Sequence, residues 1–276
     1  MGLGGHLTWT AVAREIGKRA PGVKVIPCKN KSGIFEIVRC EVFKNNPLIV
    51  QEQIKDASYF VPMILDNPAA NYCKKDTPQR AFHNPDLHII EQACQVYGIH
   101  DPELKCDIFL DEEEVSEIEK IIKNLPESFV TIEPFSKINY TPNRSYPIEK
   151  FQKIVDDLSK EIAVVQVGNP SGDKLENAID IRGTTTFRTA AGVVGDSRCF
   201  ISCEGGLVHA ATAFETRSVV IITGYQSEKM VAYPQNININ IGSHGPCGLK
   251  IECPECTKDR DIHDYSEILK SVRSLI

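Results

Sequence analysis

Residues 198–223, RCFISCEGGLVHAATAFETRSVVIIT, decide the fold. They predict a strand over 199–202, a turn with two glycines, a helix with His209 in its first turn and an apolar strand over 219–223. In an open α/β sheet, ligands bind where a strand runs into a helix, because backbone N–H groups and the positive helix end point into that crevice. The stretch therefore predicts a ligand site at its turn.

The same alternation of strand and helix continues on the N-terminal side of this stretch. Strands are predicted over residues 129–133 and 164–168, and helices over 148–158 and 184–194. Such alternation is typical of a parallel sheet with crossover helices.

The first 125 residues carry a second α/β pattern, which is less regular. Its predicted elements are helices over 7–19, 86–97 and beyond a capping box of Asp111 and Glu114, strands over 23–26, 34–39, 59–65 and 108–110, and a loop over 66–84. The glycine-rich turn of residues 2–6 lacks the strand that usually precedes such a turn, so the first strand of this half is expected to be missing here. Either the start lies several residues too late, which we favour, or the fold does without that strand. We predict an α/β fold of two facing Rossmann-like domains, residues 1–125 and 126–276, with the active site in the cleft between them.

Composition limits the classes of function. The 276 residues are 42% hydrophobic and 25% charged, which is typical of a globular protein. A net charge of -6 gives no electrostatic reason to expect a nucleic-acid partner. There is no apolar run of about 18 residues that would span a membrane, and the opening residues do not resemble a signal peptide. Ten cysteines spread along an ordinary chain favour free thiols in the reducing cytoplasm.

One group of cysteines forms a candidate metal site. The sequence Cys253-Pro-Glu-Cys256 follows His244 and Cys247 closely. Thiolates two residues apart can hold one tetrahedral ion, and a histidine can complete the coordination of Zn²⁺ or Fe. The four residues predict a structural metal site, and unligated thiols are the alternative.

Five blocks in the second half occur in the order and spacing of a known family. They are residues 132–137 (IEPFSK), 143–147 (NRSYP), 165–168 (VQVG), 180–185 (DIRGTT) and 203–211 (CEGGLVHAA). With residues 3–7 (LGGHL), they resemble glycosyltransferase family 9, the ADP-heptose:lipopolysaccharide heptosyltransferase group. The resemblance implies the GT-B architecture. It also implies inverting, metal-independent transfer of a heptose or related sugar from a nucleotide-diphosphate donor to a surface-glycan or lipid-linked acceptor. The workplace would be the cytoplasm, with peripheral contact at the inner membrane face.

The chain departs from the family pattern at two places. The family's Asp-Ser/Thr-Gly-x-x-His block has Glu204 at its first position, and the aspartate of the opening turn, thought to be the catalytic base, is replaced by Gly5. His6 is the nearest titratable residue in that turn, and the pKa of a histidine suits proton abstraction near neutrality. His6 is therefore the candidate base, while acids elsewhere in the first half stay open.

The candidate donor-binding residues lie where predicted strands end. Gly205 and Gly206 permit close backbone approach, and the N–H groups after them suit a phosphate. Glu204 suits the hydroxyl groups of a ribose or sugar. The full set is Ser136, Lys137, Arg144, Thr184, Thr185, Glu204, Gly205, Gly206, Leu207 and His209. The alternatives are a structural acid, a packed histidine, a surface lysine, and helix capping by Thr184 and Thr185.

Two other classes of function remain open on the same fold. One is a GT-B-fold nucleotide-sugar epimerase, and the other is a non-catalytic protein that binds nucleotides or glycans. A fold alone cannot separate them from a transferase.

Overall fold

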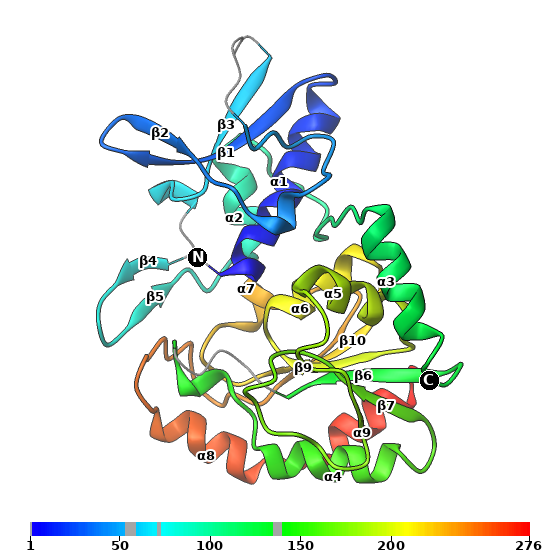
Figure 1. Cartoon of the computed structure of the whole chain (residues 1–276). Coiled ribbons are helices and arrows are strands. Elements are labelled where there is room, and N and C mark those ends of the chain that lie inside the picture. The colour runs from blue at the N-terminus through cyan, green and yellow to red at the C-terminus, as the bar shows by residue number, and fades with distance from the viewer. Residues whose placement is uncertain (1, 53–58, 71–72, 135–139) are drawn as a thin grey trace.

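The structure, a computed structural model, describes residues 2–52, 59–70, 73–134 and 140–276. It contains a six-stranded sheet in the C-terminal half, a three-stranded sheet in the N-terminal half and a separate two-stranded hairpin (Figure 1). The predicted α/β class is confirmed.

The C-terminal sheet is parallel throughout. Its strands lie in the order β11-β10-β9-β6-β7-β8, and all neighbours are parallel. The connections change direction between β6 and β9, so the segments after these two strands border the crevice in which open α/β sheets bind ligands. The strands are β6 (Phe129–Glu133), β7 (Ala163–Gln166), β8 (Ile179–Asp180), β9 (Phe200–Cys203), β10 (Ser218–Ile222) and β11 (Ile237–Asn240).

Helices cover both faces of this sheet and so bury its central strands on both sides. Every residue of β9 and β10 is buried. Figure 1 shows α4 and α9 below the sheet and α5 and α6 above it. The helical elements are η3 (Pro142–Arg144), α4 (Ile148–Leu158), α5 (Phe187–Asp196), α6 (Gly206–Ala213), α7 (Glu228–Val231), α8 (Pro254–Ile262) and α9 (Ser266–Arg273). The predicted bounds of α4 are confirmed at both ends.

The N-terminal sheet is mixed. Strand β1 pairs with β2 in antiparallel fashion and with β3 in parallel fashion, and β4 and β5 form an antiparallel hairpin apart from this sheet. The capping box of Asp111 and Glu114 at the start of α3 is confirmed. The elements of this half are α1 (Leu3–Arg19), β1 (Lys24–Lys31), β2 (Ile34–Ile37), η1 (Glu41–Phe43), β3 (Phe60–Ile64), η2 (Pro68–Ala70), β4 (Cys73–Asp76), β5 (Ala81–His83), α2 (Ile89–Gln95) and α3 (Glu112–Ile122).

Several local predictions are wrong. Residues 3–6 form the first turn of α1 rather than a turn ahead of a helix that starts at residue 7, and Gly4 in this helical turn packs closely against Gly206. Residues 66–84 hold η2 and the β4–β5 hairpin rather than a loop, because Arg80 pairs with Leu249, far along the chain. Residues 108–110 form no strand, since the side chains of Ile108 and Leu110 pack against the main core instead. Helix α5 begins after Thr186 and not at residue 184, because Thr186 and Thr189 form a capping box.

The main hydrophobic core crosses the predicted boundary at residue 125. Leu7 and Val12 of α1 belong to the same buried cluster as Leu207 and Val208 of α6. Helix α3 lies on the N-terminal side of the boundary, yet it packs against α5. The division into two domains and the missing first strand stay predictions. Among the described residues, no helix is both long and apolar enough to cross a bilayer.

Candidate functional site

The first turns of α1 and α6 touch each other. A Cβ placed on Gly4 would lie 2.8 Å from Gly206 Cα and 3.1 Å from His209 Cδ2, so only a glycine permits this approach. Both helices begin after a glycine, Gly2 and Gly205, and neither glycine can supply a side-chain cap. Because the first N–H groups of a helix lack partners within the helix and carry partial positive charge, this contact favours an anionic ligand.

Beside this contact, Arg144 and Glu204 form a buried ion pair. Arg144 Nη2 donates to Glu204 Oε2 at 2.5 Å and to its backbone oxygen at 3.1 Å, while Nε faces Oε1. Burial raises the pKa of the Glu204 carboxyl, and the Arg144 guanidinium opposes that rise. Assigned from its surroundings, the Gln226 amide also donates to Oε1 at 2.8 Å. The acid predicted at this turn is thus held by a cation and an amide at the crevice.

His209 lies in a network that joins the two halves. Its Nδ1 is 2.7 Å from the hydroxyl of Tyr233, whose ring also packs edge-on against His88. Burial, with smaller effects of His88 and Arg144, lowers the pKa of His209 to about 3. The ring is therefore neutral at physiological pH, with one nitrogen already engaged by Tyr233.

His6 points to a different side of α1. Its Nδ1 lies 3.5 Å from Cys40 Sγ, and its ring packs edge-on against Phe43. Burial is the main cause that lowers its pKa to about 4, which leaves a neutral imidazole near neutrality. Its Nε2 is buried with no hydrogen-bond partner in the described part of the chain. His6 follows Gly4 by two residues, about 200° around the helix, so it faces η1 and not α6.

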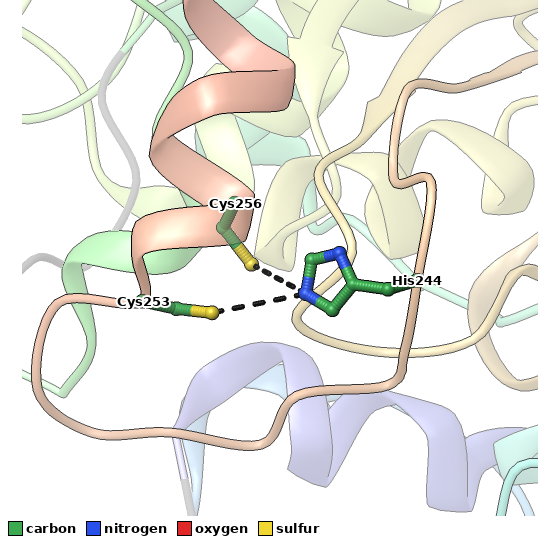
Figure 2. A group of neighbouring side chains, drawn as sticks. All are labelled: His244, Cys253 and Cys256. Carbon is green, nitrogen blue, oxygen red and sulfur yellow. Dashed lines mark hydrogen bonds between the residues drawn. The ribbon is translucent and has the colours of Figure 1, made fainter.

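Three of the four predicted metal ligands, His244, Cys253 and Cys256, come together (Figure 2), and the fourth, Cys247, lies beside Cys256. His244 Nε2 lies 3.7 Å from Cys253 Sγ and 3.8 Å from Cys256 Sγ, and the sulfurs of Cys256 and Cys247 are 3.5 Å apart. Ligands about 2.3 Å from a tetrahedral ion are about 3.7 Å from one another, so these spacings fit such an ion. The buried carboxylate of Asp259 lies 3.4 Å from His244 Nδ1, as second-sphere partners of metal-bound histidines do.

Known proteins resemble this chain in structure and not detectably in sequence. No protein-family model and no curated protein sequence matches it. The glycosyl transferase family 9 protein of Veillonella parvula superposes with a TM-score of 0.65 at 13% identity, over 100% of this chain and 94% of that one. Heptosyltransferase II of E. coli gives 0.65 at 12%, over 99% and 95%. TibC, an iron-containing dodecameric glycosyltransferase of enterotoxigenic E. coli, gives 0.68 at 14%, over 100% and 74%.

The chain has the fold of the family 9 glycosyltransferases. The resemblance predicted from the sequence blocks is thus confirmed for the fold. TibC has also been crystallised in complex with ADP-D-beta-D-heptose.

Not every predicted donor residue joins the site in this family 9 fold. Ser136 and Lys137 lie outside the described residues. Thr184 and Thr185 precede α5 without capping it, and the Thr184 hydroxyl donates to the Ile181 oxygen at 2.7 Å in an exposed turn. Gly205, Gly206, Leu207 and His209 lie at or in the start of α6, beside Glu204.

Sequence reasoning missed His83, which the N-terminal half brings to the Arg144 side of the site. The ring of His83, on β5, lies 5.1 Å from that of Tyr225, which follows β10. Burial, assisted by the charge of Arg144, lowers the pKa of His83 to about 4. Its Nδ1 is buried without a hydrogen-bond partner among the described residues. No sequence signal marks this residue, because the hairpin that carries it was predicted as a loop.

Glu133 is a second missed residue, although it lies in one of the family-like blocks. It is the last residue of β6, at the carboxyl edge next to the crevice. Its Oε1 would be 2.8 Å from a Cβ on Gly168, so a glycine there makes room for the carboxyl. Burial raises the pKa of Glu133 to about 8. A strand that ends in an acid at this edge was the available signal.

Proposed function

We propose that the chain is an inverting glycosyltransferase that moves a heptose or related sugar from a nucleotide-diphosphate donor to a surface-glycan acceptor. The observation that carries the proposal is the likeness to family 9 glycosyltransferases, which spans at least 99% of this chain in the superpositions described. We assign the acceptor to residues 1–125 and the donor to residues 126–276. We place the protein in the cytoplasm, where a lipid-linked acceptor would bring it to the inner membrane face.

The donor site would use positive groups to hold the leaving diphosphate. The contact between the α1 and α6 starts supports this role, since backbone N–H groups there suit phosphate oxygens. Arg144 would add a guanidinium whose charge is partly offset by Glu204, and we propose Lys137 as a further cation. Glu204, held by Arg144, would accept hydrogen bonds from sugar or ribose hydroxyls. Preorganised donors of this kind stabilise the charge that develops on the leaving group.

The acceptor hydroxyl needs a base, and we propose His6 first. Its imidazole is neutral at physiological pH, as a base must be, while its ring faces η1 and its Nε2 is closed to solvent in this structure. His83 is the second candidate, because it reaches the Arg144 side from the N-terminal half. Loss of a general base typically lowers the rate about 10² to 10⁴-fold. If His6 is the base, His6→Ala should therefore transfer the sugar about 10² to 10⁴-fold more slowly than the wild type, and His83→Ala should keep most of the rate. The reverse result would assign the base to His83, and donor affinity should change little in either variant.

The Cys/His cluster would hold Zn²⁺ or Fe as a structural ion, through His244, Cys247, Cys253 and Cys256. Such an ion cross-links the segments that ligate it. The transfer itself needs no metal under this proposal. Base, leaving-group stabilisation and donor orientation all come from side chains and backbone of the chain.

A panel of nucleotide-diphosphate sugars tests the proposal by thermal shift and by transfer to glycan acceptors. Saturation at about 100 times Kd adds about 2.7 kcal/mol, which corresponds to about 5 °C or more in Tm for a chain of this size. A panel in which no sugar nucleotide raises Tm would refute the donor site. Conversion of the donor sugar without an acceptor would instead indicate an epimerase.

A further inference from the structure

The metal ligands lie at both ends of a loop that reaches two other parts of the molecule. We call residues 244–256 the knuckle. His244 and Cys247 lie at its start and Cys253 and Cys256 at its end, so the segment 248–252 projects between the two ligand pairs. This segment contacts the turn that carries Arg144 and the hairpin that carries His83.

Asn143 fastens the knuckle to the Arg144 turn. Its Nδ2 donates to the backbone oxygens of Leu249 and Ile251, each at 2.8 Å, and its Oδ1 accepts from the backbone N–H of Cys253 at 2.9 Å. The side chain is fully buried. Asn143 thus bonds directly to a ligand residue and to the loop between the ligands, while the next residue pairs with Glu204.

Arg260 of α8 makes a second connection to the same turn. Its Nη1 donates to the oxygens of Pro142 at 2.8 Å and Ser145 at 3.2 Å, and its Nε donates to Cys256 O at 3.2 Å. The turn is therefore bracketed on both sides by residues attached to the metal ligands.

The knuckle also holds the hairpin. The Ala81 N–H donates to Gly248 O and the Lys250 N–H donates to Gln79 O, each at 2.8 Å. Lys250 in addition pairs with Asp76 of β4. This short antiparallel pairing links the N-terminal half, with His83, to the same loop.

We propose that a metal ion in the knuckle and a nucleoside diphosphate in the donor site bind with positive coupling, and that Asn143 is the positioning residue that carries it. An ion fixes both ends of segment 248–252, and the fixed segment supplies the two carbonyls and the N–H that orient Asn143. Without the ion, the donor would have to order this loop and the Arg144 turn on binding, which costs conformational entropy. The inference rests on the proposed donor site.

The experiment measures ADP affinity by calorimetry on the whole protein, loaded with Zn²⁺ or stripped with EDTA. We expect stripping to weaken ADP binding about tenfold or more. Because coupling is reciprocal, ADP should raise Zn²⁺ affinity in a chelator competition by the same factor. Asn143→Ala should bring both factors close to one. Asn124→Ala, at the exposed end of α3, is the matched control and should keep the full coupling.

Asn143→Asp is the second variant if Asn143→Ala fails to fold. It keeps an oxygen for the Cys253 N–H and loses the donors to Leu249 and Ile251, so it should also abolish the coupling. Equal ADP affinity of loaded and stripped protein would overturn the inference, as would a protein that binds neither Zn²⁺ nor Fe²⁺.

A third readout separates this inference from the proposed function. If ADP does not bind the Zn²⁺-loaded protein, the proposed donor site is wrong. Hydrogen exchange then tests separately whether an ion in the knuckle orders the hairpin and the Arg144 turn. Zn²⁺ loading should then still slow amide exchange in residues 79–83 and 141–146 of the wild type, and not in residues 141–146 of Asn143→Asp. Exchange that is unchanged by Zn²⁺ would overturn the role of Asn143.

Discussion

The two halves of the molecule build their share of the site in different ways. The C-terminal half places Glu133 and Glu204 at the ends of neighbouring parallel strands, where the order of the sheet fixes their positions. The N-terminal half contributes a helix start at Gly4 and a hairpin with His83, neither of which lies at an edge of its three-stranded sheet. In the C-terminal half, the local sequence of each strand is therefore enough to position a site residue. In the N-terminal half, the position of a site residue depends on contacts with residues far along the chain.

The largest effect is expected at the Arg144–Glu204 pair, where the C-terminal half buries charge. Arg144→Met leaves the Glu204 carboxylate buried without its cation, which should lower the free energy of unfolding by about 3–5 kcal/mol. Urea denaturation at pH 7 measures the loss. The double variant Arg144→Met/Glu204→Gln should lose clearly less than the sum of the single losses, and additive losses would show that the pair is not coupled.

Glu133 makes the stability of the same half depend on pH. Its folded pKa of about 8 lies above the ordinary value of 4.5, so the folded state holds the proton more tightly. The contribution is present below about pH 4.5 and is lost as pH rises through 8, by up to about 1.4 kcal/mol per pH unit. Glu133→Gln does not titrate, so it should gain roughly 3–4 kcal/mol relative to the wild type between pH 5 and 8. Equal pH profiles of the two proteins in urea denaturation would exclude a raised pKa of Glu133.

The contact between the halves is tested at Gly4. A methyl group there meets the backbone of Gly206, so Gly4→Ala should cost about 1–3 kcal/mol. Gly2→Ala is the control, because a Cβ at that position meets nothing within 4 Å, and the change should stay within about 0.5 kcal/mol. If thermal unfolding shows equal stability for both variants, the two helix starts do not touch.

The smallest loss of stability is expected at the N-terminal cap of α5 and tests which threonine forms that cap. Thr186→Ala removes the side chain that accepts from the Thr189 N–H, which should cost about 1 kcal/mol. Thr184→Ala removes only an exposed turn bond and should cost less than about 0.5 kcal/mol. A larger loss for Thr184→Ala in chemical denaturation would move the cap back to the predicted position.

The sequence predicts secondary structure best where buried residues recur at a regular spacing. Helix α4 was predicted to the residue, because Phe151, Val155 and Leu158 fall on one buried face. The start of α6 and the acid before it follow from the strand-turn-helix pattern, and the proximity of His244, Cys253 and Cys256 follows from their spacing, while their role as metal ligands stays a prediction.

Prediction fails where a partner lies far along the chain. Nothing local in residues 73–83 indicates that Ala81 pairs with Gly248, so the hairpin and His83 were missed. Likewise, nothing at Asn143 indicates that its amide holds the knuckle, because its partners are backbone groups of residues 249–253.

The pairing of the hairpin with the knuckle has a consequence for biosynthesis. The hairpin leaves the ribosome well before residues 248–250, and at about 5–20 residues per second the interval is on the order of ten seconds. During that time the edge of β5 that will later pair with residues 248–250 has no partner, and the proposed metal ligands have not yet been synthesised. The last strand contact and the proposed metal ligands thus arrive together, so a chain interrupted before the knuckle would expose an open β edge to proteases and chaperones.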